Sequence, residues 1–156
     1  METILVEDVY KVHGTSSVSV PQEIALEEII TKFAREPGVT AVFLVDSRER
    51  FAGMISRADL LKWAQLRLPG RGGSREIHVG EVLRLVFATK AEDLARGDRR
   101  SLGVRPNDTL AKALEQMINQ EEITIPVLDS EGKIMGDLRL SEVLHKALEV
   151  GRTGTE

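Results

Sequence analysis

The 156-residue chain contains one pattern twice, and this internal repeat limits the folds open to it more than any other feature. The first copy starts at Ser17 with "SVSVPQEIALEEIITKFAREPGVTAVFLVDSRERFAGMISRADLLKWA", and the second starts at Ser101 with "SLGVRPNDTLAKALEQMINQEEITIPVLDSEGKIMGDLRLSEVLHKAL". Matching residues are separated by between 83 positions (129 minus 46) and 85 positions (106 minus 21). The pairs are Asp46 with Asp129, Gly53 with Gly136, Thr40 with Thr124, and Pro21 with Pro106. We therefore expect one supersecondary unit to occur twice.

The residue pattern of each copy predicts strands and helices in the order β-α-β-β-α. A short strand over residues 18–20 or 102–104 leads into a helix whose apolar residues recur with helical period. The apolar strands "TAVFLVD" and "ITIPVLD" follow, and their continuous apolar character indicates burial on both faces. A hairpin turn, "SRER" or "SEGK", precedes a third strand (51–55 or 133–138) and a closing helix (57–66 or 140–148). We expect Asn107 or Asp108 to cap the first helix of the second copy.

A unit of about 50 residues buries too little surface to be stable alone, so the two copies are expected to pack together. The sequence therefore predicts an α/β (α+β) fold of tandem β-α-β-β-α repeats, related by a pseudo-two-fold axis and sharing a core. The expected divisions are an N-terminal segment (1–16), a first repeat (17–66), an inter-repeat segment (67–100), a second repeat (101–150) and a frayed tail (151–156). The inter-repeat segment combines a flexible "PGRGGS" loop with "HVGEVLRLVFAT", which is apolar enough to form a short helix.

The composition argues against several classes of function. A net charge of −4 and an aromatic content of 4% disfavour nucleic-acid binding. The absence of cysteine excludes disulfides and thiolate metal sites, and fits a cytoplasmic protein. No signal peptide or membrane-inserting stretch is expected, because the N-terminus carries acidic residues and no apolar run approaches about 20 residues. His13, His78 and His145 show no metal-ligand spacing, and no nucleophile–base arrangement indicates an enzyme.

The stretch "GMISRAD", residues 53–59, is the strongest candidate for a ligand site. Ser56 lies just before the closing helix, where unpaired N–H groups and the helix dipole favour an anion. The carboxylate of Asp59 can accept two hydrogen bonds and suits a vicinal diol. A structural alternative stays open, because serine or aspartate near a helix start is a common cap. Arg57 either contacts phosphate or is an exposed residue of the first helical turn.

This plan resembles a pair of CBS domains, named after cystathionine β-synthase, over residues 17–148. The two strands ending in Asp, the turns after them, and the motif Gly–apolar–any–Thr/Ser–any–any–Asp carry the resemblance, and "GMISRAD" matches every fixed position of the motif. The resemblance implies a regulatory module that senses energy state by binding AMP, ADP, ATP or another adenosyl ligand in the cleft between repeats. It also implies a homodimer that regulates a further, unidentified protein.

The resemblance also implies roles for particular residues. Asp59 would hold the ribose hydroxyls, Ser56 would bond to phosphate, and Gly53 would let the backbone pass close to the ligand. The start of the second strand would frame the base, and the first strand of the opposite copy would complete the site, although Gly103 stands where the family often has a threonine. The remaining members of this ligand-binding set are Val39, Thr40, Ala41, Met54, Ile55, Arg57, Leu102 and Gly103.

The second copy departs from the motif in "GDLRLSE". Arg139 replaces Ser56, Glu142 replaces Asp59, and Asp137 stands at a normally apolar position. Arg139 would either bind a polyphosphate or fill the cleft, paired with Asp137 or Glu142. The second, degenerate site would comprise Val18, Ser19, Thr124, Ile125, Gly136, Arg139 and Glu142. We expect one competent site, around Asp59. The alternatives are a dimerising scaffold with degenerate sites and the cytoplasmic regulatory part of a transporter or channel.

Overall fold

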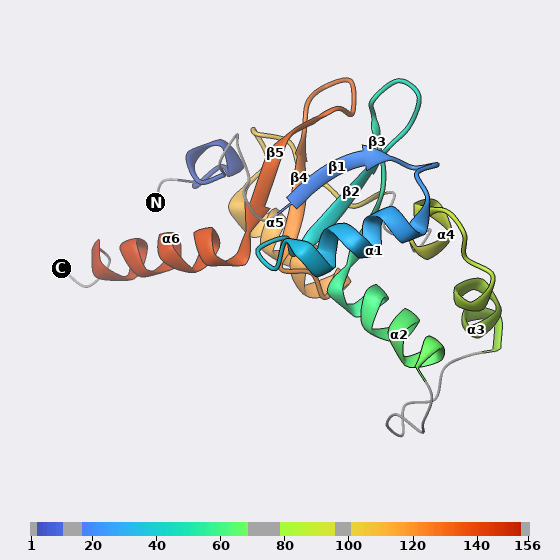
Figure 1. The fold of residues 1–156 in the computed structure, drawn as a ribbon. Coiled ribbons are helices and arrows are strands. Elements are labelled where there is room, and N and C mark those ends of the chain that lie inside the picture. The colour runs from blue at the N-terminus through green and yellow to red at the C-terminus, as the bar shows by residue number, and fades with distance from the viewer. Residues whose placement is uncertain (1–2, 11–16, 69–78, 96–100, 154–156) are drawn as a thin grey trace.

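A computed structural model describes residues 3–10, 17–68, 79–95 and 101–153 (Figure 1). The expected "PGRGGS" loop lies outside the described residues. In chain order the elements are the 3-10 helix η1 (Val6–Asp8), β1 (Ser17–Pro21), α1 (Leu26–Arg35), β2 (Ala41–Val45), β3 (Phe51–Ser56), α2 (Arg57–Arg67), α3 (Val79–Val86), α4 (Ala91–Leu94), α5 (Leu110–Gln120), β4 (Thr124–Leu128), β5 (Ile134–Arg139) and α6 (Leu140–Thr153).

The first repeat forms a three-stranded sheet in the order β1-β2-β3. β1 runs parallel to β2, and β2 is antiparallel to β3. The predicted strands and helices of this repeat are confirmed within one or two residues at each end. The short helix predicted in the inter-repeat segment is also confirmed, as α3.

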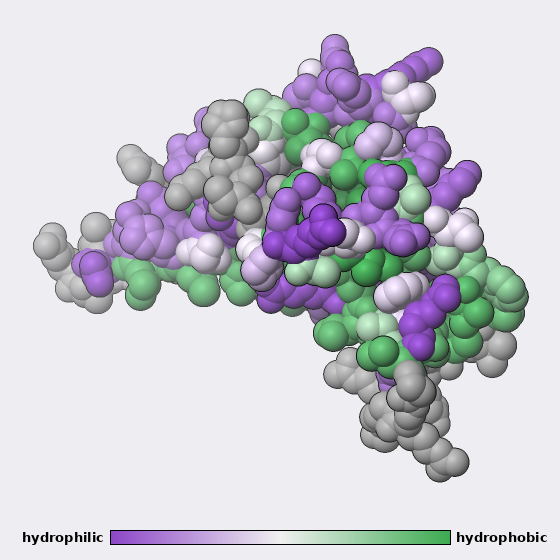
Figure 2. Space-filling model, in the orientation of Figure 1, coloured by the Kyte–Doolittle hydropathy of each residue, from purple (hydrophilic) through white to green (hydrophobic). Residues whose placement is uncertain are grey.

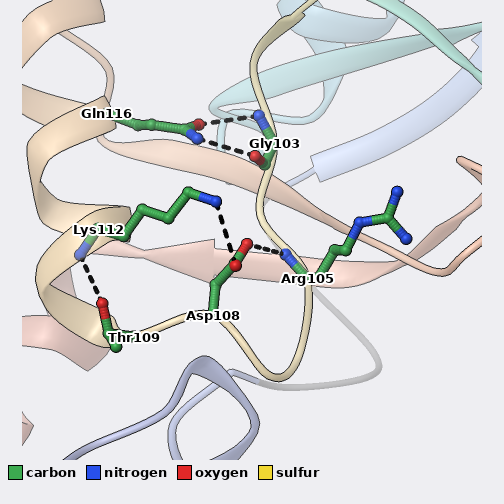
Figure 3. A network of polar contacts seen from close by, with 6 residues as sticks. All are labelled: Gly103, Arg105, Asp108, Thr109, Lys112 and Gln116. Carbon is green, nitrogen blue, oxygen red and sulfur yellow. Dashed lines mark hydrogen bonds and ion pairs between the residues drawn. The ribbon is translucent and has the colours of Figure 1, made fainter.

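The second repeat pairs only β4 with β5, so the strand predicted at residues 102–104 is wrong. In that segment Val104 alone forms a bridge, to Val127. Gly103 adopts φ +138, and the amide of Gln116 takes both of its backbone groups (Figure 3). The Gly103 N–H donates to Gln116 Oε1 at 3.0 Å, and Gln116 Nε2 donates to the Gly103 carbonyl at 3.0 Å. A side chain from α5 therefore holds the backbone of Gly103, and the pairing with β4 is limited to the bridge at Val104.

The ends of two helices also differ from expectation. The N-cap of α5 is Thr109, whose Oγ1 accepts from the N–H of Lys112 at 3.1 Å. Asp108 instead accepts from the N–H of Arg105 at 2.8 Å and from Lys112 Nζ at 3.1 Å (Figure 3). Its carboxylate therefore organises the turn before the helix. At the other end of the repeat, α6 continues to Thr153, into the expected tail.

Two short helices exchange places between the repeats. The helix η1 precedes the first repeat but packs against the second, and α4 precedes the second repeat but packs against the first. The Val6 N–H of η1 donates to the Asp108 carbonyl of the second repeat at 2.8 Å. The Ala91 N–H of α4 donates to the Ile24 carbonyl of the first repeat at 2.8 Å. The sequence signal for this exchange is the pair "VED" at residues 6–8 and "AED" at residues 91–93, which the sequence analysis missed. The repeated unit thus begins earlier than its first strand.

A two-fold relationship is visible where the hairpins meet. Arg50 bridges Lys133 in antiparallel fashion, and these residues hold the same position in the two hairpins. The strand register corrects one expected pairing, because Thr124 lies opposite Arg139 as Ala41 lies opposite Ser56. Thr124 is therefore the counterpart of Ala41 and not of Thr40. The shift arises because the helix-to-strand loop covers residues 36–40 in the first repeat but only 121–123 in the second.

The predicted shared core is confirmed. One cluster of buried residues joins Phe43 and Met54 of the first repeat to Ile125, Val127 and Leu138 of the second. The second cluster lies within the first repeat and its flanking helices, and it includes Leu85 of α3. Figure 1 shows the strands at the centre, α2, α3 and α4 on one side, and α6 pointing away from the sheets on the other.

Candidate functional site

The candidate site lies where β3 ends at Ser56 and α2 begins at Arg57. Ser56 is 5% exposed and Asp59 is 2% exposed. The Ser56 N–H donates to Asp59 Oδ2 at 2.9 Å, and Ser56 Oγ donates to the same oxygen at 3.2 Å. Asp59 Oδ2 therefore caps the start of α2, which is the structural alternative that the sequence left open. The result is a buried serine–aspartate pair at the N-terminus of an 11-residue helix.

The base-framing segment lies beside this pair. Ala41 is directly opposite Ser56 in the sheet, so Val39 and Thr40 lead the chain into the junction. Val39 is 6% exposed and Ala41 is fully buried, whereas Thr40 is half-buried. The structure thus places the segment 39–41 next to the Ser56–Asp59 pair.

The other first-repeat members of the predicted ligand-binding set lie in β3 or directly after it. Met54 and Ile55 are fully buried in the two cores, so only their backbone groups are available to a ligand. Gly53 adopts φ +154, and a Cβ built there would lie 3.6 Å from the Ala95 Cβ. Arg57 is exposed. The backbone at Gly53 therefore needs glycine for its conformation more than for space.

Leu102 and Gly103 are held within the second repeat. Leu102 is 3% exposed and belongs to the shared core. Gly103 is fastened to Gln116, and a Cβ there would lie 2.8 Å from Leu128 Cδ1. These contacts fix the segment against β4, and its contribution to the first site stays a prediction.

The corresponding junction of the second repeat is filled by charged side chains. Arg139 Nε lies 3.4 Å from Asp137 Oδ1 and 3.3 Å from Glu142 Oε1. The Arg139 N–H also donates to Glu142 Oε1 at 3.0 Å. Asp137 is fully buried, and the Arg139 side chain is 19% exposed. Of the two alternatives for Arg139, the structure shows the ion pairs.

The remaining members of the degenerate site surround this cluster only in part. Thr124 and Ile125 are buried at the start of β4, and Gly136 is half-buried in β5. Val18 packs in the core of the first repeat, and Ser19 is exposed on β1. The structure therefore groups the second-repeat members around the junction, and it gives Val18 a packing role.

Sequence reasoning missed Glu122, which is 6% exposed. Because the loop before β4 is shorter, the strand register places Glu122 at the counterpart of Val39. With Asp137 at the counterpart of Met54, the second junction holds buried carboxylates where the first holds apolar side chains. A negatively charged phosphate is disfavoured beside buried carboxylates.

Three cavities are found on the described part of the chain. One of about 430 Å³ is lined by η1 and α6, including Glu142 of the second junction, and one of about 470 Å³ is lined by α1, α2 and the segment before α4. A third of about 550 Å³ lies between the two hairpins. Neither Ser56 nor Asp59 lines any of these three. Because Asp59 is almost fully buried, a ligand can reach its carboxylate only if neighbouring side chains move.

The fold and junctions define a class: a tandem α+β module whose two repeats share a core and carry one polar strand-to-helix motif each. A family model described as "CBS domain" matches residues 6–65 and 98–149. The chain belongs to the CBS domain family. No curated protein matches the chain.

Solved structures agree with this fold. A CBS domain-containing protein from Thermotoga maritima is 24% identical, with a TM-score of 0.70 over 92% of this chain and 94% of that one. CBSX2 in complex with AMP is 19% identical, with a TM-score of 0.69 over 95% and 98%. The CBS domain pair of protein MJ0100, in complex with 5′-methylthioadenosine and S-adenosyl-L-methionine, is 14% identical, with a TM-score of 0.64 over 97% and 99%. Within residues 3–10, 17–68, 79–95 and 101–153, no helix is long and apolar enough to cross a membrane.

Proposed function

We propose that the chain is a regulatory module that binds an adenine nucleotide or related adenosyl ligand at the first junction, around Ser56 and Asp59. The observation that carries the proposal is the buried Ser56–Asp59 pair at the N-terminus of α2. The helix N-terminus favours a phosphate, and a carboxylate suits the ribose hydroxyls. Related folds are solved with AMP, or with 5′-methylthioadenosine and S-adenosyl-L-methionine, which supports an adenosyl ligand here.

The same reasoning argues for one competent site. At the second junction, Arg139 is held between Asp137 and Glu142, so its charge is already matched by carboxylates. A phosphate that bound there would have to replace these ion pairs in a buried setting. The proposed role is regulation rather than catalysis. Ligand entry would move the side chains that cover Asp59, and differential affinity for the covered and open states would shift their populations.

Calorimetric titration tests the proposal. Wild-type protein titrated separately with AMP, ADP and ATP is expected to give heat with at least one of them. Asp59→Ala is expected to weaken that binding by at least tenfold, because a hydrogen bond to a charged group contributes about 1.5–3 kcal/mol. Asp59→Asn is the second variant, since it keeps the shape of the side chain if the alanine variant unfolds.

Glu142→Ala is the matched control, because Glu142 holds the corresponding position at the second junction. It is expected to leave affinity within twofold of the wild type. An absence of heat with all three nucleotides at millimolar concentration contradicts the proposal. Lost binding in Glu142→Ala, together with retained binding in Asp59→Asn, would instead assign the ligand to the second junction.

We also propose that the chain forms a homodimer through α5 and α6. Four large apolar side chains on these helices are 38–66% exposed: Leu114, Ile118, Leu144 and Leu148. The corresponding helix positions of the first repeat are less apolar, with Ile30, Ala34, Leu61 and Gln65. Figure 2 shows hydrophobic residues along one edge of α6. Neighbouring exposed apolar side chains of this size are what a protein–protein interaction surface requires.

Light scattering after size-exclusion chromatography tests the dimer. Leu148→Glu is expected to convert dimer to monomer, and Leu61→Glu on the first repeat is the matched control that leaves the dimer intact. A monomeric wild type would contradict the dimer. A dimer that persists in all variants, without any nucleotide binding, would favour the scaffold alternative, which the filled second junction also favours.

A further inference from the structure

One side-chain hydrogen bond joins the predicted base-framing segment to the second repeat. The hydroxyl oxygens of Thr40 and Thr124 lie 3.3 Å apart, and either can be the donor. Thr124 is 2% exposed and Thr40 is half-buried. The bond therefore lies at the edge of the interior, with the more open partner on the side of the first junction.

The two-fold relationship does not repeat this bond. By strand register the counterpart of Thr124 is Ala41, and the counterpart of Thr40 is Ile123. Neither alanine nor isoleucine has a hydroxyl, so the symmetric contact cannot form. Thr40 and Thr124 therefore form a polar connection that serves the first junction and has no equivalent at the second.

The placement of Thr124 suits a supporting role. It begins β4, where its backbone is opposite Arg139 in the two-stranded sheet. Its near-complete burial limits the rotamers of the side chain, and a β-branched residue has few to begin with. Thr40 is in the loop before β2, where the chain has more freedom. The buried hydroxyl of Thr124 thus gives the Thr40 side chain a contact that favours one of its rotamers.

We propose that Thr124 is a positioning residue of the first site, although the sequence had grouped it with the second. By holding the Thr40 hydroxyl, it orders the segment 39–41 that leads to Ser56. This inference rests on the proposed nucleotide site. It also supplies a polar contribution from the second repeat to the first site, where Gly103 provides no side chain.

The experiment compares Thr124→Val, which removes the hydroxyl, with Thr124→Ser, which keeps it. AMP titration is expected to show about three- to tenfold weaker binding for Thr124→Val, which corresponds to about 0.7–1.4 kcal/mol and is typical of one hydrogen bond. Thr124→Ser is expected to stay within twofold of the wild type. Thr31→Val is the matched control, because the Thr31 hydroxyl donates to the Glu27 carbonyl on α1, at 2.8 Å.

A second measurement needs no ligand. Three-bond couplings of the Thr40 methyl group by NMR are expected to report one χ1 rotamer in the wild type and in Thr124→Ser, and averaging in Thr124→Val. Unchanged couplings in Thr124→Val overturn the positioning role whether or not nucleotide binds. If the wild type binds AMP and Thr124→Val binds it with the same affinity, the positioning role is overturned as well. A wild type that binds none of the nucleotides overturns the proposed function, and the site role of Thr124 with it.

Discussion

The two strand-to-helix junctions share one backbone-to-carboxylate hydrogen bond but differ in the charge of the side chains around it. In the first, the carboxylate of Asp59 accepts from the backbone N–H of Ser56, three residues before it. In the second, the carboxylate of Glu142 accepts from the backbone N–H of Arg139, with the same spacing. Around this shared bond the first junction carries one small hydroxyl group, and the second carries a cation between two acids.

The difference separates what folding requires from what it does not. Both junctions keep a carboxylate at the third helical position, so this acid contributes to the start of the helix in either case. The serine position is different, because the fold accepts arginine there when acids surround it. Ser56 is thus not demanded by the backbone, which favours a ligand-directed role. The same comparison shows that Asp59 combines two roles, the observed cap of α2 and the proposed contact to a ligand.

The largest effect is expected from Arg139→Met. This change leaves Asp137 and Glu142 buried without the guanidinium that lies between them. Removing one partner of a buried ion pair typically costs about 3 kcal/mol or more. Urea unfolding followed by circular dichroism should show this loss, whereas Ser56→Ala at the first junction should cost about 1 kcal/mol.

A combined variant sharpens this comparison. Asp137→Met, Arg139→Ser and Glu142→Asp together give three positions of the second junction the side chains of the first. The combination is expected to be more stable than Arg139→Met alone, because it also removes the buried acid at position 137. An Arg139→Met protein as stable as the wild type would show that the charged cluster does not stabilise the second junction.

The next effect compares two glycines with positive φ. Gly103→Ala is expected to destabilise the protein by about 2 kcal/mol, since a strained φ is combined with a close contact to Leu128. Gly53→Ala is expected to cost about 1 kcal/mol, because its Cβ would meet Ala95 only at ordinary van der Waals distance. Equal losses in urea unfolding would contradict the crowding at Gly103.

The parts of the fold that could be predicted from the sequence depend on local pattern. The strands "TAVFLVD" and "ITIPVLD" are continuous apolar runs that end in Asp, and both became buried strands. The pairing of Ser56 with Asp59 was also visible as a cap or a ligand site, and the structure shows the capping bond. In each case the deciding residues are neighbours in the chain.

The parts that could not be predicted depend on distant contacts. The strand at 102–104 is reduced to the bridge at Val104, next to Gly103, which has φ +138 and bonds through both backbone groups to the amide of Gln116. The counterpart of Thr124 was misjudged because the loop after α1 is two residues longer than the loop after α5 while α1 is one residue shorter, so the register shifts by one position at Thr40. Glu122 was missed for the same reason, since only the register places it at the position of Val39. Periodicity does not encode which remote side chain bonds to a given backbone group.

A smaller effect is expected at the hairpin turns, which are the most similar parts of the two repeats. Gly132 has φ +84, and its counterpart Glu49 has φ +61. Gly132→Ala is expected to cost about 1 kcal/mol, because a Cβ disfavours the left-handed region. Glu49→Gly is expected to gain about half as much, since the relief of strain is offset by the greater freedom of glycine in the unfolded chain. Urea unfolding of both variants would measure the difference, and a loss of stability in Glu49→Gly would contradict it.

The smallest effect concerns the aspartates that begin these turns. Asp46 Oδ1 accepts from the N–H groups of Arg48 and Arg50 at 2.8 and 3.0 Å, and Asp129 Oδ1 accepts from those of Glu131 and Lys133 at the same distances. The bond from the Arg50 N–H lowers the pKa of Asp46 below its ordinary 3.8, and the bond from the Lys133 N–H lowers the pKa of Asp129 in the same way.

A lowered pKa in the folded state gives a defined pH dependence. The stabilisation from each carboxylate is fully present above the unfolded pKa near 3.8, and it is lost as the pH falls below that value through the lower folded pKa. Asp46→Asn and Asp129→Asn are each expected to reduce the loss of stability between about pH 5 and pH 2, measured by urea unfolding at each pH. Because the two turns have the same backbone bonds to the aspartate, those bonds alone would make the two reductions equal. A clear inequality would show that Arg50, whose Nε also lies 3.0 Å from Asp46 Oδ2, makes the first turn electrostatically different from the second.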